Sequence, residues 1–362
     1  MHLNWAIRLL MGTAFAVAAP VIGLAEAKAQ VGQDDVFQLV IAAATAKNPR
    51  NSESDIIELR DGRLLLGWTE FYAGNGADDG AARIVGRVST DSGRSWGDKY
   101  TLVENDGTCN VMEVSFLRLN SGDLALFHLQ KNVEVGGPQA PDCRVMLRTS
   151  QDEGRTFGPA RQLTGEKRYV ETASGRGLRL KTGRILVECD TLETAFCLIS
   201  DDDGATWREG QPVKPSGGGC WEPAAVERKD GRVLMFLRTG LGGQYQTISE
   251  DGGVTWGEAT LTALRGTAAP IAIERIPTTG DLLAVWNNDL GSPRARNPLT
   301  AAISRDDGKT WEHFRNAADA AGDAFAYPSV TFVGDRALLT YFNYQEGISL
   351  LLQGMPVKWF YP

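Results

Sequence analysis

The chain has 362 residues and a formal net charge of −8 at pH 7. This charge argues against a nucleic-acid surface, because such proteins neutralise phosphates with clustered Lys and Arg. The length exceeds that of a usual single core, which favours a fold that grows by adding repeats.

The first segment has the order of a secretory signal. Arg8 precedes an apolar run over residues 9–19, and alanines occupy alternate positions from Ala25 to Ala29. The run is short and ends at Pro20, which favours a cleaved signal over a membrane anchor. We therefore expect residues 1–29 to be a signal peptide and residues 30–362 to form one exported domain, periplasmic or secreted, without stable membrane insertion after cleavage.

A short turn motif, S-x-D-x-G-x-[T/S]-[W/F], occurs five times along the chain. Its Ser and Asp bond nearby backbone, its Gly permits positive φ, and its aromatic residue anchors the turn. Evenly spread copies indicate a repeat architecture. The copies are Ser89 to Trp96, Ser150 to Phe157, Ser200 to Trp207, Ser249 to Trp256 and Ser304 to Trp311.

A second pattern, two apolar strands joined by a Gly or Asp turn, occurs six times and is typical of tight β-hairpins. A hairpin, a third strand, the motif and a fourth strand make one four-stranded unit, so we predict an all-β, six-bladed propeller. The last unit lacks the motif, and we expect the strand from Asp35 to Ala42 to complete it and close the ring. The hairpins cover residues 56–68, 116–128, 177–189, 225–237, 273–286 and 329–342.

Polar residues gather on one rim of this predicted propeller. In a four-stranded meander, the loop entering strand one and the loop joining strands two and three lie at the same end, opposite the turn motifs. Each such residue taken singly is more often solvated surface, but their concentration favours a site. The residues are Arg50, Asp78, Asp79, Glu222, Arg238, Arg296 and Tyr327.

Five cysteines in an exported chain admit disulfides. Cys189 and Cys197 would face each other on adjoining strands, and Cys109 and Cys143 could pair between loops, leaving Cys220 over. The alternative is five unpaired thiols that act as small buried side chains.

The motifs and their spacing resemble the sialidase (neuraminidase) superfamily, whose six-bladed propellers carry these turns as Asp-boxes. The segment from Glu222 to Arg238 is similar to the family's Glu-to-Arg segment in order and spacing. Arg296 looks like the family's third arginine and Tyr327-Pro328 like its catalytic tyrosine. Arg50 fits the first arginine loosely, because Asn51-Ser52 follows it where the family has Ile-Pro.

The resemblance implies an exo-acting glycosidase that removes a terminal sialic acid or related acidic sugar. Three arginines would hold the substrate carboxylate, which suits their donor fork. Tyr327 would attack, Glu222 would accept its proton, and Asp78 or Asp79, with Asp78 preferred, would act as the general acid. The outcome would be retention of configuration through a tyrosine nucleophile.

Arg176, in the segment that resembles the start of the family's third blade, would line the pocket or lie at the solvated surface. No metal or organic cofactor is expected, since the three histidines show no ligand spacing. The expected partner is an acidic glycan. Three alternatives stay open: an enzyme for another acidic sugar (Kdn, Kdo, another ulosonic acid or a uronate), a non-catalytic glycan-binding propeller, and a polysaccharide lyase.

Overall fold

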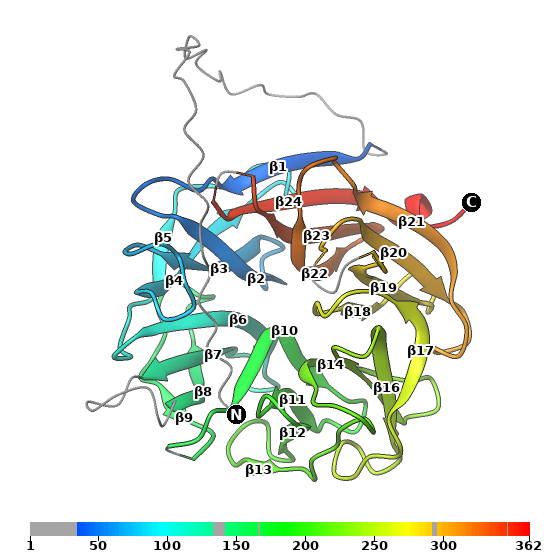
Figure 1. Cartoon of the computed structure of the whole chain (residues 1–362). Helices are drawn as coiled ribbons and strands as arrows, with labels where there is room; N and C mark the ends of the chain where they lie inside the picture. The colour runs from blue at the N-terminus through cyan, green and yellow to red at the C-terminus, as the bar shows by residue number, and fades with distance from the viewer. Residues whose placement is uncertain (1–34, 133–141, 166, 292–294, 346) are drawn as a thin grey trace, which may run out of the picture. The chain divides into compact units, whose positions relative to one another are not determined.

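The computed structural model describes residues 35–132, 142–165, 167–291, 295–345 and 347–362. These residues form six four-stranded sheets arranged around a centre (Figure 1). The predicted six-bladed all-β propeller is therefore confirmed. The expected signal peptide, residues 1–29, lies outside the described residues.

The strands of each blade are consecutive in the chain, except in blade six. Blade one holds β2 (Arg50–Glu58), β3 (Leu64–Phe71), β4 (Ala82–Ser89) and β5 (Tyr100–Val103); blade two holds β6 (Asn110–Arg118), β7 (Leu124–Asn132), β8 (Asp142–Ser150) and β9 (Arg161–Gln162). Blade three holds β10 (Glu171–Arg179), β11 (Ile185–Asp190), β12 (Ala195–Ser200) and β13 (Arg208–Glu209); blade four holds β14 (Trp221–Glu227), β15 (Val233–Arg238), β16 (Gly243–Ser249) and β17 (Thr260–Arg265). Blade five holds β18 (Ala272–Arg275), β19 (Leu282–Asn287), β20 (Leu299–Ser304) and β21 (Glu312–Ala318); blade six holds β22 (Phe325–Val333), β23 (Arg336–Asn343), β24 (Ser349–Pro356) and β1 (Phe37–Ala42).

A short 3-10 helix, Val357–Phe360, follows the last strand. Within the described segments, no helix combines the length and the apolar character needed to cross a membrane.

The ring is closed by the first and last strands of the chain. β1 pairs antiparallel with β24, with Phe37 opposite Gly354 and Val40 opposite Leu351. The expectation that the segment from Asp35 to Ala42 completes blade six is thus confirmed. This closure covers an edge that β24 would otherwise present unpaired.

The turn motifs join the third and fourth strands of blades one to five, and the third blade shows how they are built. Ser200 Oγ donates to Asp202 Oδ1 at 2.9 Å, and Asp202 Oδ1 accepts the backbone N–H of Thr206 at 2.7 Å. Gly204, at φ 85°, donates its N–H to Ser200 Oγ, while its carbonyl accepts the indole N–H of Trp207 at 3.0 Å. The motif therefore satisfies its own backbone and acts as scaffold.

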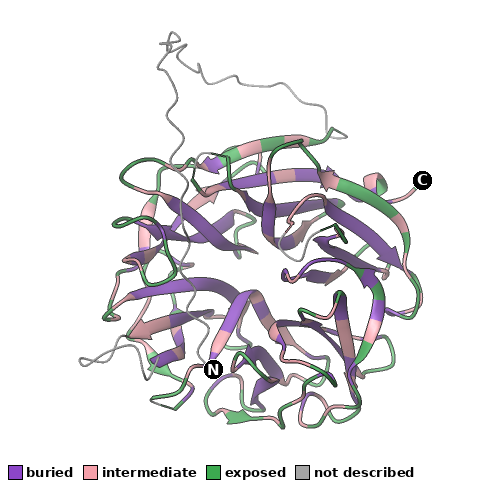
Figure 2. Ribbon diagram, in the orientation of Figure 1, coloured by how far each residue is buried: buried purple, intermediate pink, exposed green. Residues whose placement is uncertain are grey.

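Apolar packing between neighbouring blades forms the core. Figure 2 shows the strands near the centre largely buried, whereas exposed residues concentrate on outer strands and turns. Trp68, Trp286 and Tyr341 are among the largest fully buried side chains. Each pair of adjacent sheets thus shares an apolar layer that holds the first strands in place.

All five cysteines are unpaired, which agrees with the alternative of five free thiols. The proposed pairing of Cys189 with Cys197 fails on strand register: Cys189 lies opposite Phe196, and Cys197 lies opposite Glu188. Because neighbouring residues of a strand point to opposite faces, the two thiols enter different apolar layers. Cys109 and Cys143 are also free.

Candidate active site

The site begins with an irregularity shared by five of the six first strands, which lie nearest the centre (Figure 1). Each has a β-bulge in its pairing with the second strand, and a residue with positive φ lies at the bulge. A bulge bends the strand and re-aims a side chain. Left-handed backbone is costly for residues other than glycine, and such residues cluster at functional sites. The residues are Glu53 (φ 43°), Glu113 (φ 63°), Gly175 (φ 69°), Glu222 (φ 40°) and Tyr327 (φ 53°).

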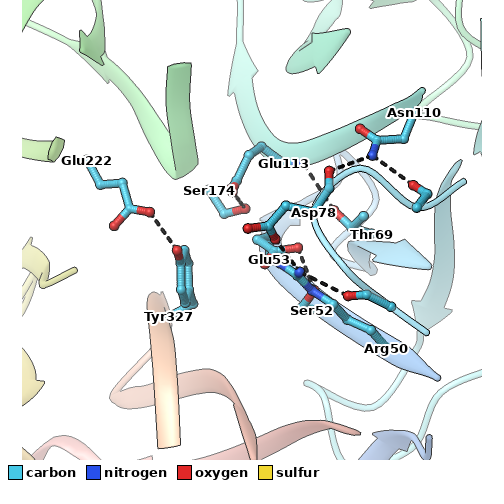
Figure 3. A network of polar contacts seen from close by, with 12 residues as sticks. Arg50, Ser52, Glu53, Thr69, Asp78, Asn110, Glu113, Ser174, Glu222 and Tyr327 are labelled. Carbon is cyan, nitrogen blue, oxygen red and sulfur yellow. Dashed lines mark hydrogen bonds and ion pairs between the residues drawn. The ribbon is translucent and has the colours of Figure 1, made fainter. Parts of the chain in front are cut away.

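Two of these bulge residues, from blades four and six, are in direct contact. Tyr327 Oη donates to Glu222 Oε1 at 2.6 Å (Figure 3). The other carboxylate oxygen of Glu222 accepts a hydrogen bond and forms an ion pair with Arg238. The structure therefore joins three predicted residues into a chain of phenol, carboxylate and guanidinium.

The protonation states of this chain follow from its contacts. Burial acts to raise the pKa of Glu222, but the charge of Arg238 and the hydrogen bonds from Tyr327 and Arg238 outweigh it and lower that pKa. Burial and the charge of Glu222 raise the pKa of Tyr327 well above 10. At neutral pH the carboxylate is therefore ionised and the phenol carries its proton, as a base and the group it would deprotonate require.

Arg296 reaches the same place from the loop before β20. Its guanidinium carbon lies 5.6 Å from the ring centroid of Tyr327, and its Nη1 donates to Tyr344 Oη at 2.9 Å. Arg238 keeps its Nε buried without a hydrogen-bond partner among the described residues. Donors of two arginines therefore flank the phenol, which suits the binding of a carboxylate beside it.

The first of the three predicted arginines differs from the other two in its contacts. Arg50 is the first residue of β2 and donates from Nε to Ser52 Oγ at 2.7 Å and from Nη1 to the Gly76 carbonyl at 3.3 Å and Asp78 Oδ1 at 2.5 Å. Its Nη2 donates to Glu53. Four of the five guanidinium N–H groups are thus used within the protein. Arg50 is less available to an anion than sequence alone suggested.

The two candidate acids, Asp78 and Asp79, lie in the exposed loop between β3 and β4. Asp78 faces Arg50, with 74% of its side chain exposed. Partial desolvation acts to raise the pKa of Asp78, but the charge and the hydrogen bond of Arg50 lower it overall. Asp79 instead lies toward Cys109. Burial raises the pKa of Cys109, and the charge of Asp79 raises it further. Of the pair, Asp78 is the one directed to the site.

Arg176 is buried in the described structure, which contradicts the surface alternative. Its Nη2 donates to the carbonyl of Ile271 at 2.8 Å, and its Nε has no hydrogen-bond partner among the described residues. Burial lowers its pKa, whereas the charges of Glu188 and Glu222 act in the opposite direction. It therefore supplies positive charge among buried carboxyl groups at the centre.

Two buried glutamates of the site, Glu53 and Glu113, were missed by the sequence analysis. Glu53 accepts from Arg50 and from Ser52 Oγ, and Glu113 accepts from Ser174 Oγ at 2.7 Å (Figure 3). A signal was present in the sequence. Glu53, Glu113 and Glu222 each precede a hairpin glycine, Gly62, Gly122 and Gly231, by the same nine positions.

Across the described ranges, no three His, Cys, Asp or Glu side chains are grouped so as to hold a metal ion. The charged groups of the site are instead arginines and carboxyls that pair with each other. Their arrangement suits acid–base and nucleophilic chemistry on an anionic ligand.

The propeller and its repeated turn motifs define a class of protein, the repeat-built β-propellers with a polar site on one rim. Comparison with known proteins agrees with this class. The family model for the BNR repeat-like domain matches residues 62–340. The chain belongs to this family.

Among characterised relatives, the chain is similar to a sialidase of Micromonospora viridifaciens, with 29% identity over 286 residues that cover 69% of this chain and 43% of that protein. The matched part thus spans less than half the length of that relative. Two solved structures share the fold at a TM-score of 0.74. One is a Hadza microbial sialidase, 17% identical, with 86% of this chain and 66% of that chain covered; the other is a protein of unknown function from Dyadobacter fermentans, 18% identical, with 88% and 98% covered.

Proposed function

We propose that the protein hydrolyses the glycosidic bond of a terminal sialic acid or a related acidic sugar. The hydrogen bond of 2.6 Å from Tyr327 Oη to Glu222 Oε1 carries this proposal. A binding protein has no need for a phenol held against an ionised carboxylate in this way. The similarity to sialidases supports the choice of sugar.

In the proposed reaction, Tyr327 Oη attacks the anomeric carbon while Glu222 accepts the phenolic proton. A neutral phenol suits this task, because a carboxylate nucleophile would be repelled by a substrate carboxylate on the same carbon. The sugar–oxygen bond breaks, and the leaving oxygen takes a proton from Asp78. Water activated by Asp78 then attacks the anomeric carbon, the Tyr327 oxygen leaves and takes its proton back from Glu222, and the sugar is released with retention of configuration.

Because Asp78 contacts Arg50, Asp78 must gain a proton before it can act as the general acid. In the free protein the guanidinium favours the ionised carboxylate, which has no proton to give. A substrate carboxylate that pairs with Arg296 would offset the charge of Arg296, which also lowers the pKa of Asp78, and would place a negative charge nearby. Both changes raise the pKa of Asp78, so we propose that the substrate itself prepares its proton donor.

The test uses a fluorogenic glycoside of sialic acid. We expect wild-type protein to release the fluorophore, and Tyr327→Phe and Glu222→Gln each to lose about 10²-fold or more of kcat. Tyr327→Phe should keep the wild-type Tm, whereas Glu222→Gln should lower it, because Arg238 loses its charged partner. Exposed Glu250→Gln serves as the matched control and keeps full activity. Glycoside binding without turnover at any pH would support a binding propeller, and an unsaturated product absorbing in the ultraviolet would support a lyase.

A second candidate substrate, another acidic sugar such as Kdn, Kdo, a different ulosonic acid or a uronate, is favoured by one observation. Arg50 has most of its donors engaged, so the carboxylate would be held chiefly by Arg238 and Arg296. A panel of these glycosides with the same leaving group decides between the sugars by kcat/KM.

The proposal includes an exported location for the enzyme, periplasmic or secreted. Residues 1–29 carry the charged, apolar and small-residue order of a signal peptide. The intact mass of the protein recovered from a secreting host tests this. A mass that retains residues 1–29 would contradict it.

A further inference from the structure

The bulge that carries Glu222 lies outside the regular pairing of its own sheet. β14 pairs with β15 at Trp221 and again from Ala224, and the register shifts between these two positions, so Glu222 and Pro223 lie in the bulge. Glu222 has φ 40° and directly precedes a proline, and both features make its backbone conformation costly. Such a conformation persists only where surrounding contacts maintain it.

Asp190 supplies one of these contacts from the neighbouring blade. It is the last residue of β11, it is fully buried, and its Oδ2 accepts the backbone N–H of Glu222 at 2.8 Å. Its Oδ1 accepts the backbone N–H of Leu192 at 2.8 Å, in the connection between β11 and β12. Because each oxygen binds a main-chain donor, the direction of the carboxyl group is fixed. Asp190 therefore sets the position of the backbone from which Glu222 projects.

Glu188 makes a second contact of this kind, on the other side of the bulge. It lies two residues before Asp190 in β11, so both side chains point to the same face of the strand. Glu188 Oε1 accepts the backbone N–H of Ala225 at 3.2 Å. The two contacts differ in what they support. Asp190 bonds to the proposed proton acceptor itself, whereas Glu188 bonds to the strand three residues further along.

The position of Asp190 has the same use in two other blades. Asp190, Thr69 and Asn287 each follow the glycine of their hairpin by seven positions. Thr69 Oγ1 accepts the backbone N–H of Glu113 at 3.0 Å, and Asn287 Nδ2 donates to the Phe325 carbonyl at 3.0 Å. In each case the partner is the first strand of the next blade, at its bulge or two residues before it. Blades one, three and five therefore each support the bulge of the blade that follows.

The proposed reaction depends on where the carboxylate of Glu222 lies. Tyr327 Oη donates to Glu222 Oε1 at 2.6 Å, which joins blade six to blade four (Figure 3). A misplacement of reacting groups by about 1 Å can cost on the order of 10²-fold in rate. A shift of the bulge would move the carboxylate away from the phenol, so the contact that fixes the bulge affects the proton transfer.

We propose that Asp190 is a positioning residue for the proposed reaction. It fixes the bulge of β14 so that Glu222 Oε1 stays within hydrogen-bond reach of Tyr327 Oη. Its effect on the reaction passes through Glu222 and not through the substrate. This inference rests on the proposed function and adds a residue to it.

The first experiment measures the steady-state kinetics of Asp190→Asn on the fluorogenic glycoside of sialic acid. An amide presents one oxygen and one NH2 group, so it cannot accept both backbone N–H groups. We expect kcat to fall by about tenfold while KM changes by less than about twofold. Should Asp190→Asn not fold, Asp190→Ala is measured in its place with the same expectation, because the space it leaves admits water to the two N–H groups.

Glu188→Gln is the matched control, because it alters the other contact between β11 and β14. It should keep kcat within about twofold of wild type. The double variant Asp190→Asn/Glu222→Gln separates positioning from a general loss of structure. If Asp190 acts through Glu222, this variant has the same kcat as Glu222→Gln alone. Wild-type kcat in Asp190→Asn, or a further tenfold loss in the double variant, would overturn the proposal.

Crystal structures of the wild type and the two single variants decide the inference independently of turnover. In Asp190→Asn we expect the distance from Tyr327 Oη to Glu222 Oε1 to exceed about 3.5 Å, whereas Glu188→Gln should keep it near 2.6 Å. An unchanged distance in Asp190→Asn would contradict the positioning role. If the wild type cleaves no glycoside, the proposed function fails, and this comparison of distances still decides whether Asp190 positions Glu222.

Discussion

Individual side chains of this site differ mainly in how their charges are satisfied. Glu53 and Glu113 occupy equivalent bulges of neighbouring blades, and both are buried. Glu53 forms an ion pair with Arg50, whereas Glu113 accepts a hydrogen bond from the uncharged hydroxyl of Ser174. Burial and the charge of Glu53 raise the pKa of Glu113 well above 4.5. The same residue type therefore forms an ion pair in one blade and is a neutral acid in the next.

We predict that replacing glutamate by glutamine lowers the unfolding free energy much more at position 53 than at position 113. Glu53→Gln leaves the buried Arg50 without one of its charged partners and should cost about 3 kcal/mol of unfolding free energy at pH 7. Glu113→Gln replaces a carboxyl that is already neutral and should cost less than about 1 kcal/mol. Urea unfolding of both variants measures the difference, and equal losses would contradict the assignment of charge.

At the scale of single elements, hydrogen-bonded turns and edge pairing decide where the site can be. The turn motifs occupy the connection between third and fourth strands, so they leave the other rim to the functional loops. The strand β1 seals the last blade, which keeps Tyr327 on β22 in a continuous ring. Blade six thus both closes the ring and carries the candidate nucleophile.

Two neighbouring residues of β1 test that closure. Ile41 is buried and packs in the apolar layer between blades six and one, whereas 62% of Val40 is exposed. Ile41→Ala should destabilise the protein by about 2–4 kcal/mol, because it leaves a cavity in the layer. Val40→Ala should change stability by less than about 0.5 kcal/mol. Thermal unfolding compares the two, and a stable Ile41→Ala would show that β1 contributes little to closure.

In the molecule as a whole, the centre of the ring concentrates buried acids. Burial raises the pKa of Asp55 to about 7 and the pKa of Glu188 to about 8, although Arg176 lowers both. Carboxyls from different blades therefore stay protonated at a pH where they would ionise in the unfolded chain. Keeping these carboxyl groups buried in the folded ring lowers the free energy of unfolding by an amount that depends on pH.

That cost gives a pH dependence of stability with a defined sign. Glu188 ionises near 4.5 when unfolded and near 8 when folded, so between these values the unfolded chain binds fewer protons and stability falls as pH rises. In Glu188→Gln this contribution is absent. From pH 4.5 to pH 8 the variant should gain on the order of a few kcal/mol relative to wild type. Denaturant unfolding across this range measures the gain, and exposed Glu250→Gln should show none.

The amino-acid sequence by itself determined the propeller, its six blades, the closing strand and the rim that carries the arginines, Glu222 and Tyr327. These features depend on local turn chemistry and on strand periodicity, which a single sequence displays. The position of a hairpin glycine even marked Glu53 and Glu113, once the bulge of Glu222 was known to matter.

Only the tertiary structure decided which side chains meet. A one-residue difference in register separates Cys189 from Cys197, because each step along a strand changes the face. The tertiary contacts likewise decided that Arg50 is engaged by Asp78 and Glu53 and that Arg176 is buried. Charge pairing and burial join residues that are far apart in the chain, so they follow from packing and not from local pattern.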